Sequence, residues 1–336
     1  FTGGALEKIL KASTDRLWKS LSFGVLSTTL MQSSSLVSVI TISFLSAGLL
    51  EITSAIGIIF GANLGTTTGA WLVAGLGLKV NLSAYAMPML VFGIVLIFQQ
   101  IRNLKGAGYI LAGLGFLFLG IHYMKEGFDS FGQTIDLSLY AATGYPGVLL
   151  FTLIGIIATV VMQSSHATLI LILAALSVQQ ISYENALALA IGSNVGTTIT
   201  AILGAIGANT SGRRLAAAHF IFNMVTGLFA VLTIYQLMAA VAWISSILGI
   251  ANDNYTLQLA VFHTVFNLVG IFLMLPLLNR LVVFLERLIP AEKVEIEVPL
   301  YLNEASREMT EAAVEAVRNE TIRLYDLAVG IINDGL

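Results

Sequence analysis

The chain has 336 residues, of which 57% are hydrophobic and only 10% are charged, and its mean hydropathy is +0.89. These values exclude an ordinary soluble domain and predict an all-α integral membrane protein. The net charge of −3 decides nothing by itself, and the absence of cysteine removes disulfide and thiolate–metal chemistry.

The chain opens with a segment suited to the membrane surface. Residues 4–20 mix leucine, isoleucine and tryptophan with lysine and arginine, which predicts an amphipathic interfacial helix over 1–20. From Leu21 to Leu50 the chain is apolar, but Gln32-Ser33-Ser34-Ser35 divides it into arms shorter than the roughly 20 residues that a spanning helix needs. We therefore expect a re-entrant hairpin with an unwound polar tip.

The next apolar stretch, 52–76, is long enough to cross but contains Gly61 to Thr68, a run of glycine, asparagine and threonine. This run predicts a broken transmembrane helix. Residues 80–101 and 106–128 predict two ordinary crossings, which completes a first repeat over 21–128. Residues 129–146 are predicted to be an extracytoplasmic loop.

The same plan then returns. Met31-Gln32-Ser33-Ser34-Ser35 is repeated as Met162-Gln163-Ser164-Ser165-His166, and Asn63-Leu64-Gly65-Thr66-Thr67 as Asn194-Val195-Gly196-Thr197-Thr198, both 131 residues further on. The second repeat, 147–285, is expected to hold a hairpin at 148–178, a broken helix at 183–208 and crossings near 215–248 and 255–279.

The number of crossings predicts how the repeats are oriented. Three crossings separate the two Gln-Ser-Ser motifs, so the second hairpin enters from the opposite side, which makes the repeats inverted and places their polar tips near the membrane midplane. Lysine and arginine gather on one side of this layout, which predicts a multi-pass inner or plasma membrane protein with both termini in the cytoplasm. After Pro290 the composition becomes polar, and 290–336 is predicted to be a cytosolic helical tail.

The polar breaks suggest what is bound. Serine hydroxyls, a carboxamide and free N–H groups at the start of a half-helix suit phosphate or a carboxylate. Neutral carbonyl and hydroxyl oxygens in an unwound Asn-x-Gly-Thr-Thr segment suit an alkali cation. The alternative is that these hydroxyls only bond to their own helices, which is common for an isolated serine but a poor account of a duplicated pair of motifs.

The histidines are less informative. His219 and His263 each begin a His-x-x-Phe-Asn pattern, which places the histidine and the asparagine on one helical face. Packing and hydrogen bonding are favoured over a proton relay, and a metal centre is disfavoured because no cysteine or acidic cluster accompanies them.

At these motifs the chain resembles the sodium-dependent phosphate cotransporter family, the type II Na/Pi symporters and their bacterial relatives. The resemblance covers about 20–285, and the tail from Leu302 looks like the start of a PhoU-type domain. It implies a phosphate and sodium site made of thirteen residues: Gln32, Ser33, Ser34, Ser35, Asn63, Thr66, Thr67, Gln163, Ser164, Ser165, Asn194, Thr197 and Thr198. The Na⁺ ligands are expected among Gln32, Ser33, Asn63, Thr66, Gln163, Ser164, Asn194 and Thr197. His166 departs from the doubled motif.

The sequence thus predicts a secondary active transporter that couples Na⁺ entry to phosphate import by alternating access. Its expected partners are inorganic phosphate, sodium ions and the lipid bilayer, without nucleic acid or an organic cofactor, and homodimerisation is left open. A Na⁺-coupled carboxylate or other anion symporter is one alternative, and a membrane phosphate sensor with little transport is another. An enzyme is not expected, because no nucleophile–base–acid set lies near the polar breaks.

Overall fold

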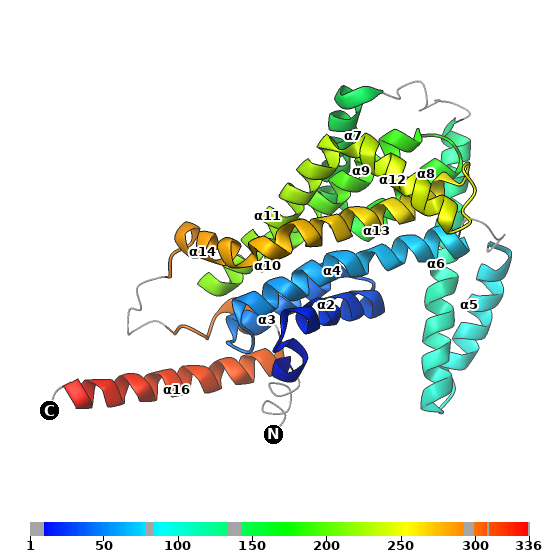
Figure 1. The fold of residues 1–336 in the computed structure, drawn as a ribbon. Helices are drawn as coiled ribbons and strands as arrows, with labels where there is room; N and C mark the ends of the chain where they lie inside the picture. The colour runs from blue at the N-terminus through cyan, green and yellow to red at the C-terminus, as the bar shows by residue number, and fades with distance from the viewer. Residues whose placement is uncertain (1–9, 78–82, 133–142, 292–298, 308, 335–336) are drawn as a thin grey trace. The chain divides into compact units, whose positions relative to one another are not determined.

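The computed structural model describes residues 10–77, 83–132, 143–291, 299–307 and 309–334 (Figure 1). Within these ranges the regular structure is helical, with no strand, which confirms the predicted all-α class. Six helical segments in the described ranges are long and apolar enough to cross a membrane: Ile52–Gly75, Arg102–Phe128, Gly144–Met162, Tyr183–Gly204, Thr210–Leu232 and Tyr255–Leu288. The chain is therefore a helical membrane protein.

The contacts divide the chain into two compact units. Unit 1 comprises Phe1–Thr66, Asn194–Phe229 and Phe266–Leu336, and unit 2 comprises Thr67–Ser193 and Ala230–Val265. Each unit therefore takes segments from both halves of the sequence.

Unit 1 is built from the first polar hairpin and parts of the second repeat. It contains α2 (Leu17–Met31), α3 (Ser34–Ser46), most of α4 (Ile52–Leu72), α10 (Thr198–Gly204), most of α11 (Thr210–Leu232), the end of α13 (Tyr255–Met274), η3 (Leu275–Leu277) and α14 (Leu278–Leu288). Its apolar centre includes Phe60 of α4 and Phe222 of α11, whose rings stack with centroids 4.3 Å apart.

Unit 2 carries the end of α4 with η1 (Val73–Gly77), α5 (Ser83–Ile97), α6 (Arg102–Gly132), α7 (Gly144–Met162), α8 (Ser165–Ser177), most of α9 (Tyr183–Gly196), α12 (Ile234–Ile247) and the start of α13. Helices α5 and α6 form a close pair (Figure 1), with Gly93 and Gly108 at their contact. α5 is shorter than the predicted crossing at 80–101, of which residues 80–82 lie outside the described ranges.

The same glycine contact occurs in both units. In unit 1, a Cβ on Gly61 of α4 would overlap the carbonyl oxygen of Leu21 on α2, and one on Gly24 would overlap that of Ile58. The residues 131 positions later make the same contacts in unit 2. A Cβ on Gly192 of α9 would overlap the carbonyl oxygen of Thr152 on α7, and one on Gly155 would overlap that of Leu189. Small residues thus let two pairs of membrane helices approach closely.

This packing corrects one prediction. α4 runs without interruption through Asn63 to Thr68, so the break predicted there is wrong, and the irregularity comes later, at the π-helix η1. Gly61 serves close packing against α2. The side chains of Asn63 and Thr66 bond to carbonyls four residues back in α4, which keeps the helix regular. The second predicted break is confirmed, because α9 ends at Gly196 and α10 begins at Thr198.

Helix lengths differ from the prediction around the second hairpin as well. α7 begins at Gly144, inside the stretch predicted as a loop, and is long enough by itself to cross a membrane. The arm before Gln163 is therefore longer than the half-helix expected from the sequence. The loop prediction is also too wide at its start, since α6 continues to Gly132.

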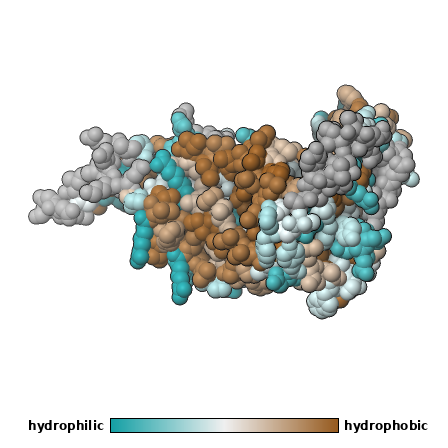
Figure 2. Space-filling view, turned by 90° about the horizontal axis from the view of Figure 1, so that it is seen from above, coloured by the Kyte–Doolittle hydropathy of each residue, from teal (hydrophilic) through white to brown (hydrophobic). Residues whose placement is uncertain are grey.

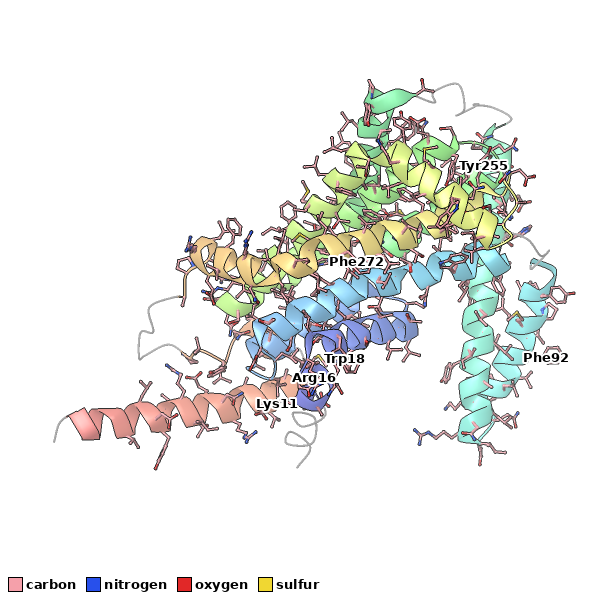
Figure 3. All side chains as sticks on the ribbon, in the orientation of Figure 1. Lys11, Arg16, Trp18, Phe92, Tyr255 and Phe272 are labelled. Atoms are coloured by element: carbon pink, nitrogen blue, oxygen red, sulfur yellow. The ribbon has the colours of Figure 1, made fainter. Side chains whose placement is uncertain are left out.

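Large apolar side chains lie on the outside of many helices. Figure 2 shows brown, hydrophobic residues gathered over one face, and the exposed set includes Leu30, Phe92, Trp243 and Phe272. Figure 3 labels Phe92 on α5 and Phe272 on α13, which are 64% and 72% exposed. Apolar side chains on this scale suit contact with lipid tails.

The start of the described chain has a different surface. Figure 3 places Lys11, Arg16 and Trp18 together where α2 begins, and Trp18 is 60% exposed. The ammonium group of Lys19 lies 5.9 Å from the centre of the Trp18 ring. Exposed tryptophan among basic residues is typical of a membrane interface. Residues 1–9 of the predicted amphipathic helix lie outside the described ranges.

The carboxyl-terminal segment packs on the rest of unit 1. It includes α15 (Glu304–Arg307) and α16 (Thr310–Asp334), and α16, red in Figure 1, begins close to α3. Asn319 donates to the carbonyl of Ala47 at 2.7 Å, and the amide of Ala305 donates to the carbonyl of Gly207 at 3.3 Å. The tail is thus tied both to the end of α3 and to the turn between α10 and α11.

Candidate functional site

The first polar break is a tight turn between two helices. α2 ends at Met31, and its C-cap residue Gln32 has φ 50° and ψ 28°, in the left-handed region. Ser33 then caps α3. The Ser33 hydroxyl accepts the backbone N–H of Leu36 at 3.2 Å, while the Gln32 amide donates to the carbonyl of Thr29 at 2.7 Å. A positive φ is uncommon for residues other than glycine and asparagine, and backbone strain of this kind is concentrated at functional sites.

The backbone dihedral angles of the second break are nearly the same as those of the first. Gln163 is the C-cap of α7, with φ 52° and ψ 24°, and Ser164 caps α8 by accepting the N–H of Ala167 at 3.1 Å. Ser33 and Ser164 have φ of −148° and −151°. Two segments 131 residues apart therefore adopt the same turn, which gives the sequence repeat a structural counterpart.

Unit 1 brings residues of the two repeats into contact. The hydroxyl oxygens of Ser35 on α3 and Thr200 on α10 lie 3.1 Å apart. The Thr200 hydroxyl is also 2.8 Å from the carbonyl oxygen of Thr197. Because one hydroxyl has a single hydrogen, Thr200 donates to one of these oxygens at a time, and Ser35 donates to Thr200 when Thr197 is chosen. The first Gln-Ser-Ser motif thus lies beside the second Asn-x-Gly-Thr-Thr segment.

The remaining predicted residues of unit 1 are mostly buried and bond locally. Asn63 donates to the carbonyl of Ile59 at 2.9 Å, Thr66 to that of Ala62 at 3.0 Å and Thr198 to that of Val195 at 2.8 Å. Asn194 differs, since its amide donates across to the carbonyl oxygen of the Asn267 side chain on α13 at 2.9 Å. Ser34 is also buried.

Unit 2 holds Thr67 and the second Gln-Ser-Ser motif. Thr67 and Ser165 are buried, while His166 is partly buried in the first turn of α8. The turn is braced by Thr168, whose hydroxyl lies 3.0 Å both from the Ser164 carbonyl and from the hydroxyl of Thr159 on α7. α8 packs against η1, the irregular end of α4.

Two residues in these contacts were not among the predicted site residues. Thr200 has no counterpart in the first repeat, where Gly69 occupies the matching position, so a search for repeated residues passes over it. Asn267 belongs to the His-x-x-Phe-Asn pattern, and its bond to Asn194 shows what that asparagine does. His219, in the other copy of the pattern, is buried and has no hydrogen-bond partner at either ring nitrogen among the described residues.

The arrangement offers neutral oxygens and N–H donors in a largely apolar setting. Hydroxyls, an interrupted helix and asparagine side chains can replace the hydration shell of a small cation, while helix starts favour anions. Within the described ranges, no cluster of three or more histidine or acidic residues could hold a metal ion.

Comparison with known proteins identifies the family. The model of the Na⁺/Pi-cotransporter family matches residues 1–126 and 130–275. The chain belongs to the Na⁺/Pi-cotransporter family. This is a family of transporters, and the resemblance predicted from the Gln-Ser-Ser motifs is confirmed.

The curated relatives are distant in sequence. "Uncharacterized protein YqeW" of Bacillus subtilis is 28% identical over 290 residues, covering 85% of this chain and 90% of that protein. "Putative inorganic phosphate export protein YjbB" of Escherichia coli K12 is 26% identical over 329 residues, covering 96% of this chain and 58% of that protein. The chain thus spans little more than half the length of the YjbB proteins. No solved structure matches.

Proposed function

We propose that this family member is a Na⁺-coupled symporter of inorganic phosphate, working by alternating access with two inverted repeats, and that both termini face the cytoplasm. One observation carries the proposal: the two Gln-Ser-Ser turns share the same left-handed glutamine and the same serine cap in two units of an apolar protein. The recurrence of this polar turn at corresponding positions of the two repeats supports a role in binding.

The exchange of segments between units supports a two-fold relation between the repeats, on which the proposed inverted arrangement depends. In unit 1, α3 of the first repeat packs on α10 of the second, and in unit 2, α8 of the second repeat packs on the end of α4 from the first. Such reciprocal pairing is expected for two repeats related by a two-fold axis. The thirteen predicted site residues remain the proposed ligands of phosphate and Na⁺.

Energetics indicate how many ions are needed. Importing a phosphate dianion tenfold uphill against 100 mV costs about 6 kcal/mol, and one Na⁺ entering down a tenfold gradient supplies about 3.7 kcal/mol. Two sodium ions supply about 7.4 kcal/mol and suffice for the dianion, whereas the monoanion needs about 3.7 kcal/mol and one ion.

Export is a second candidate direction, because the name of the YjbB relatives describes phosphate export. The two directions make different demands on the gradients. An inward Na⁺ gradient drives import by a symporter, whereas export at an inside-negative potential needs no sodium, because the potential already expels the anion.

Transport of labelled phosphate into proteoliposomes tests the proposal. We expect uptake with an inward Na⁺ gradient and none when choline replaces sodium. Efflux from phosphate-loaded vesicles that is indifferent to sodium would instead support uncoupled export, and inhibition by succinate without inhibition by arsenate would favour a carboxylate transporter. Phosphate binding without turnover would favour a sensor.

A further inference from the structure

The carboxyl-terminal tail is hydrogen-bonded to the turn between α10 and α11. Residues 299–307, which we call the strap, lie against this turn before α16 begins. The backbone N–H of Ala305 donates to the carbonyl of Gly207 at 3.3 Å. The side-chain amide of Asn209 donates to the carbonyl of Leu300 at 3.4 Å. The strap is thus joined at two points to a turn that belongs to the second repeat.

The end of α3 is joined to the same turn and to the tail. The side-chain amide of Asn209 also donates to the carbonyl of Ser46 at 2.9 Å, and the amide of Asn319 on α16 donates to the carbonyl of Ala47 at 2.7 Å. Carbonyls at the end of a helix lack partners within that helix, so donors from elsewhere satisfy them. The first hairpin, the second repeat and the tail therefore meet at this helix end.

Glu320 fixes the strap on α16. Its side chain is buried, and its Oε2 atom accepts the backbone N–H groups of Leu300 and Tyr301 at 2.7 and 2.8 Å. Its Oε1 atom accepts the Nε–H of Arg323 at 2.6 Å. Hydrogen bonds to a charged group are strong, and a buried charge is costly to leave without them. The strap and α16 are therefore held together as one piece.

A glycine in the first repeat makes room for the tail. Gly48 follows α3 with φ 76°, and a Cβ there would lie 3.0 Å from a ring carbon of Tyr301 and 3.1 Å from the amide nitrogen of Asn319. The residue 131 positions later, Gln179, has a φ of 60° and keeps a full side chain. The left-handed backbone alone therefore does not require glycine here. Contact with the tail accounts for it.

The strap borders a cavity. It forms one wall of a space of about 900 Å³, whose other walls include the start of α4 and the start of α11. A segment beside a cavity loses little packed surface when it detaches, and segments of this kind open locally at low free energy. The strap is thus suited to detach while the helices of unit 1 stay folded.

A restraint on one end of α3 acts on the other end as well. α3 is a single helix of 13 residues, about 20 Å long, and the serine cap of the first Gln-Ser-Ser turn lies at its start. Alternating access moves the helices of one repeat against those of the other, and a link between α3 and the α10–α11 turn opposes that movement. The tail can therefore influence transport without touching the polar turn.

We propose that the strap is a brake on phosphate transport. While Glu320 and Asn319 hold it in place, α3 of the first repeat is tied to the α10–α11 turn of the second, and the conformational step that limits transport is slow. When the strap detaches, that step becomes faster, whereas the residues that contact phosphate are unchanged. The brake requires only that the chain transports phosphate, in either direction, and it is independent of sodium coupling.

A disulfide tests the brake reversibly. The chain has no cysteine, and a Cβ on Gly207 would lie 2.7 Å from the Cβ of Glu304, so a small shift of the strap brings two introduced cysteines to the roughly 3.5–4.5 Å that a disulfide requires. In proteoliposomes, Gly207→Cys/Glu304→Cys should lose most of its phosphate transport when oxidised and recover it when a reductant is added. Each single cysteine variant is the control and should not respond to the reductant. Because the same folded protein is measured in both states, a folding defect cannot produce the difference.

Release of the strap should have the opposite effect. Asn319→Ala should raise the maximal rate of phosphate transport about two- to tenfold, the range expected for loss of one hydrogen bond, and leave the phosphate KM within about twofold. Gly48→Gln should do the same by displacing Tyr301. Thr321→Ala, which loses only a hydrogen bond within α16, is the first control. Gln179→Gly, the reciprocal change in the second repeat, is the other, and neither control should change either constant.

Three results would overturn the brake. One is an oxidised double variant that transports as fast as its reduced form. Another is an unchanged or lower maximal rate for Asn319→Ala, and the third is a change confined to the phosphate KM. Absence of phosphate transport in every form would overturn the brake together with the proposed function.

Discussion

Replacing Gln32 by glycine separates what its backbone does from what its side chain does. The residue sits at φ 50° and ψ 28°, a conformation that costs an L-residue about 1–2 kcal/mol and costs glycine almost nothing. Gln32→Gly removes this strain, but it also removes the bond from the carboxamide to the Thr29 carbonyl, worth about 0.5–1.5 kcal/mol, and adds chain entropy worth about 0.5–1 kcal/mol. The effects nearly cancel, so the stability of the fold should change by less than about 1 kcal/mol.

Transport should respond very differently. If the carboxamide binds a charged substrate or ion, its loss removes a hydrogen bond of about 1.5–3 kcal/mol, which lowers transport about ten- to a hundredfold. Gln32→Ala also loses the carboxamide but keeps the Cβ and therefore the strain. It should transport as poorly as the glycine variant and melt at a lower temperature.

Phosphate uptake in proteoliposomes and thermal unfolding in detergent provide the two measurements. The same pair of substitutions at Gln163, whose φ is 52°, is an internal repeat of the experiment. Normal uptake by Gln32→Gly would show that the site needs only the left-handed backbone, and the proposed role of the side chain would be abandoned. A large fall in its melting temperature would refute the strain argument.

Three further predictions concern packing. Gly61→Ala should destabilise the protein by about 1–3 kcal/mol in a melting assay, because the new Cβ overlaps the backbone of α2. Gly113→Ala is the control, because a Cβ there has no neighbour within contact distance, and it should be neutral or stabilising. Equal effects of the two changes would contradict the close-packing argument. Asn267→Leu should cost about 1–3 kcal/mol, because it removes the oxygen that accepts a hydrogen bond from the Asn194 amide. The double variant Asn194→Leu/Asn267→Leu should cost less than the sum of the two single changes, and strict additivity would refute the pairing. Asn319→Ala should loosen the tail from α3 and speed tryptic cleavage after Arg318 and Arg323. Thr321→Ala is the control, because it loses only a hydrogen bond within α16, and it should not speed cleavage. Equal cleavage rates for the two variants and the unaltered chain would count against the Ala47 contact.

The fold class and both Gln-Ser-Ser breaks could be predicted from the sequence, because hydropathy and local turn chemistry carry those signals. Whether α4 is broken or continuous could not be predicted from the sequence. The same Gly-Ala-Asn-Leu-Gly-Thr-Thr letters that suggest a break also suit close packing against α2 and side-chain bonds back to the helix, and only the position of the neighbouring helix decides between them.

Contacts between the repeats were also beyond the sequence. A repeat shows which residues correspond, such as Ser35 and His166, but not which residues touch, such as Ser35 and Thr200. Thr200 and Asn267 were missed for this reason, because each is linked to the site by a hydrogen bond to a residue distant in the chain.

The sharing of both units between the two repeats has a consequence for how such a protein could arise and be divided. A single repeat on its own leaves α3 without α10, and α8 without the end of α4, so it completes neither unit. A half-length ancestor would therefore have functioned as a pair of chains that lend each other these segments. By the same reasoning, two fragments cut between Gly132 and Thr143 and expressed together should find each other in the membrane, whereas either fragment alone should be degraded.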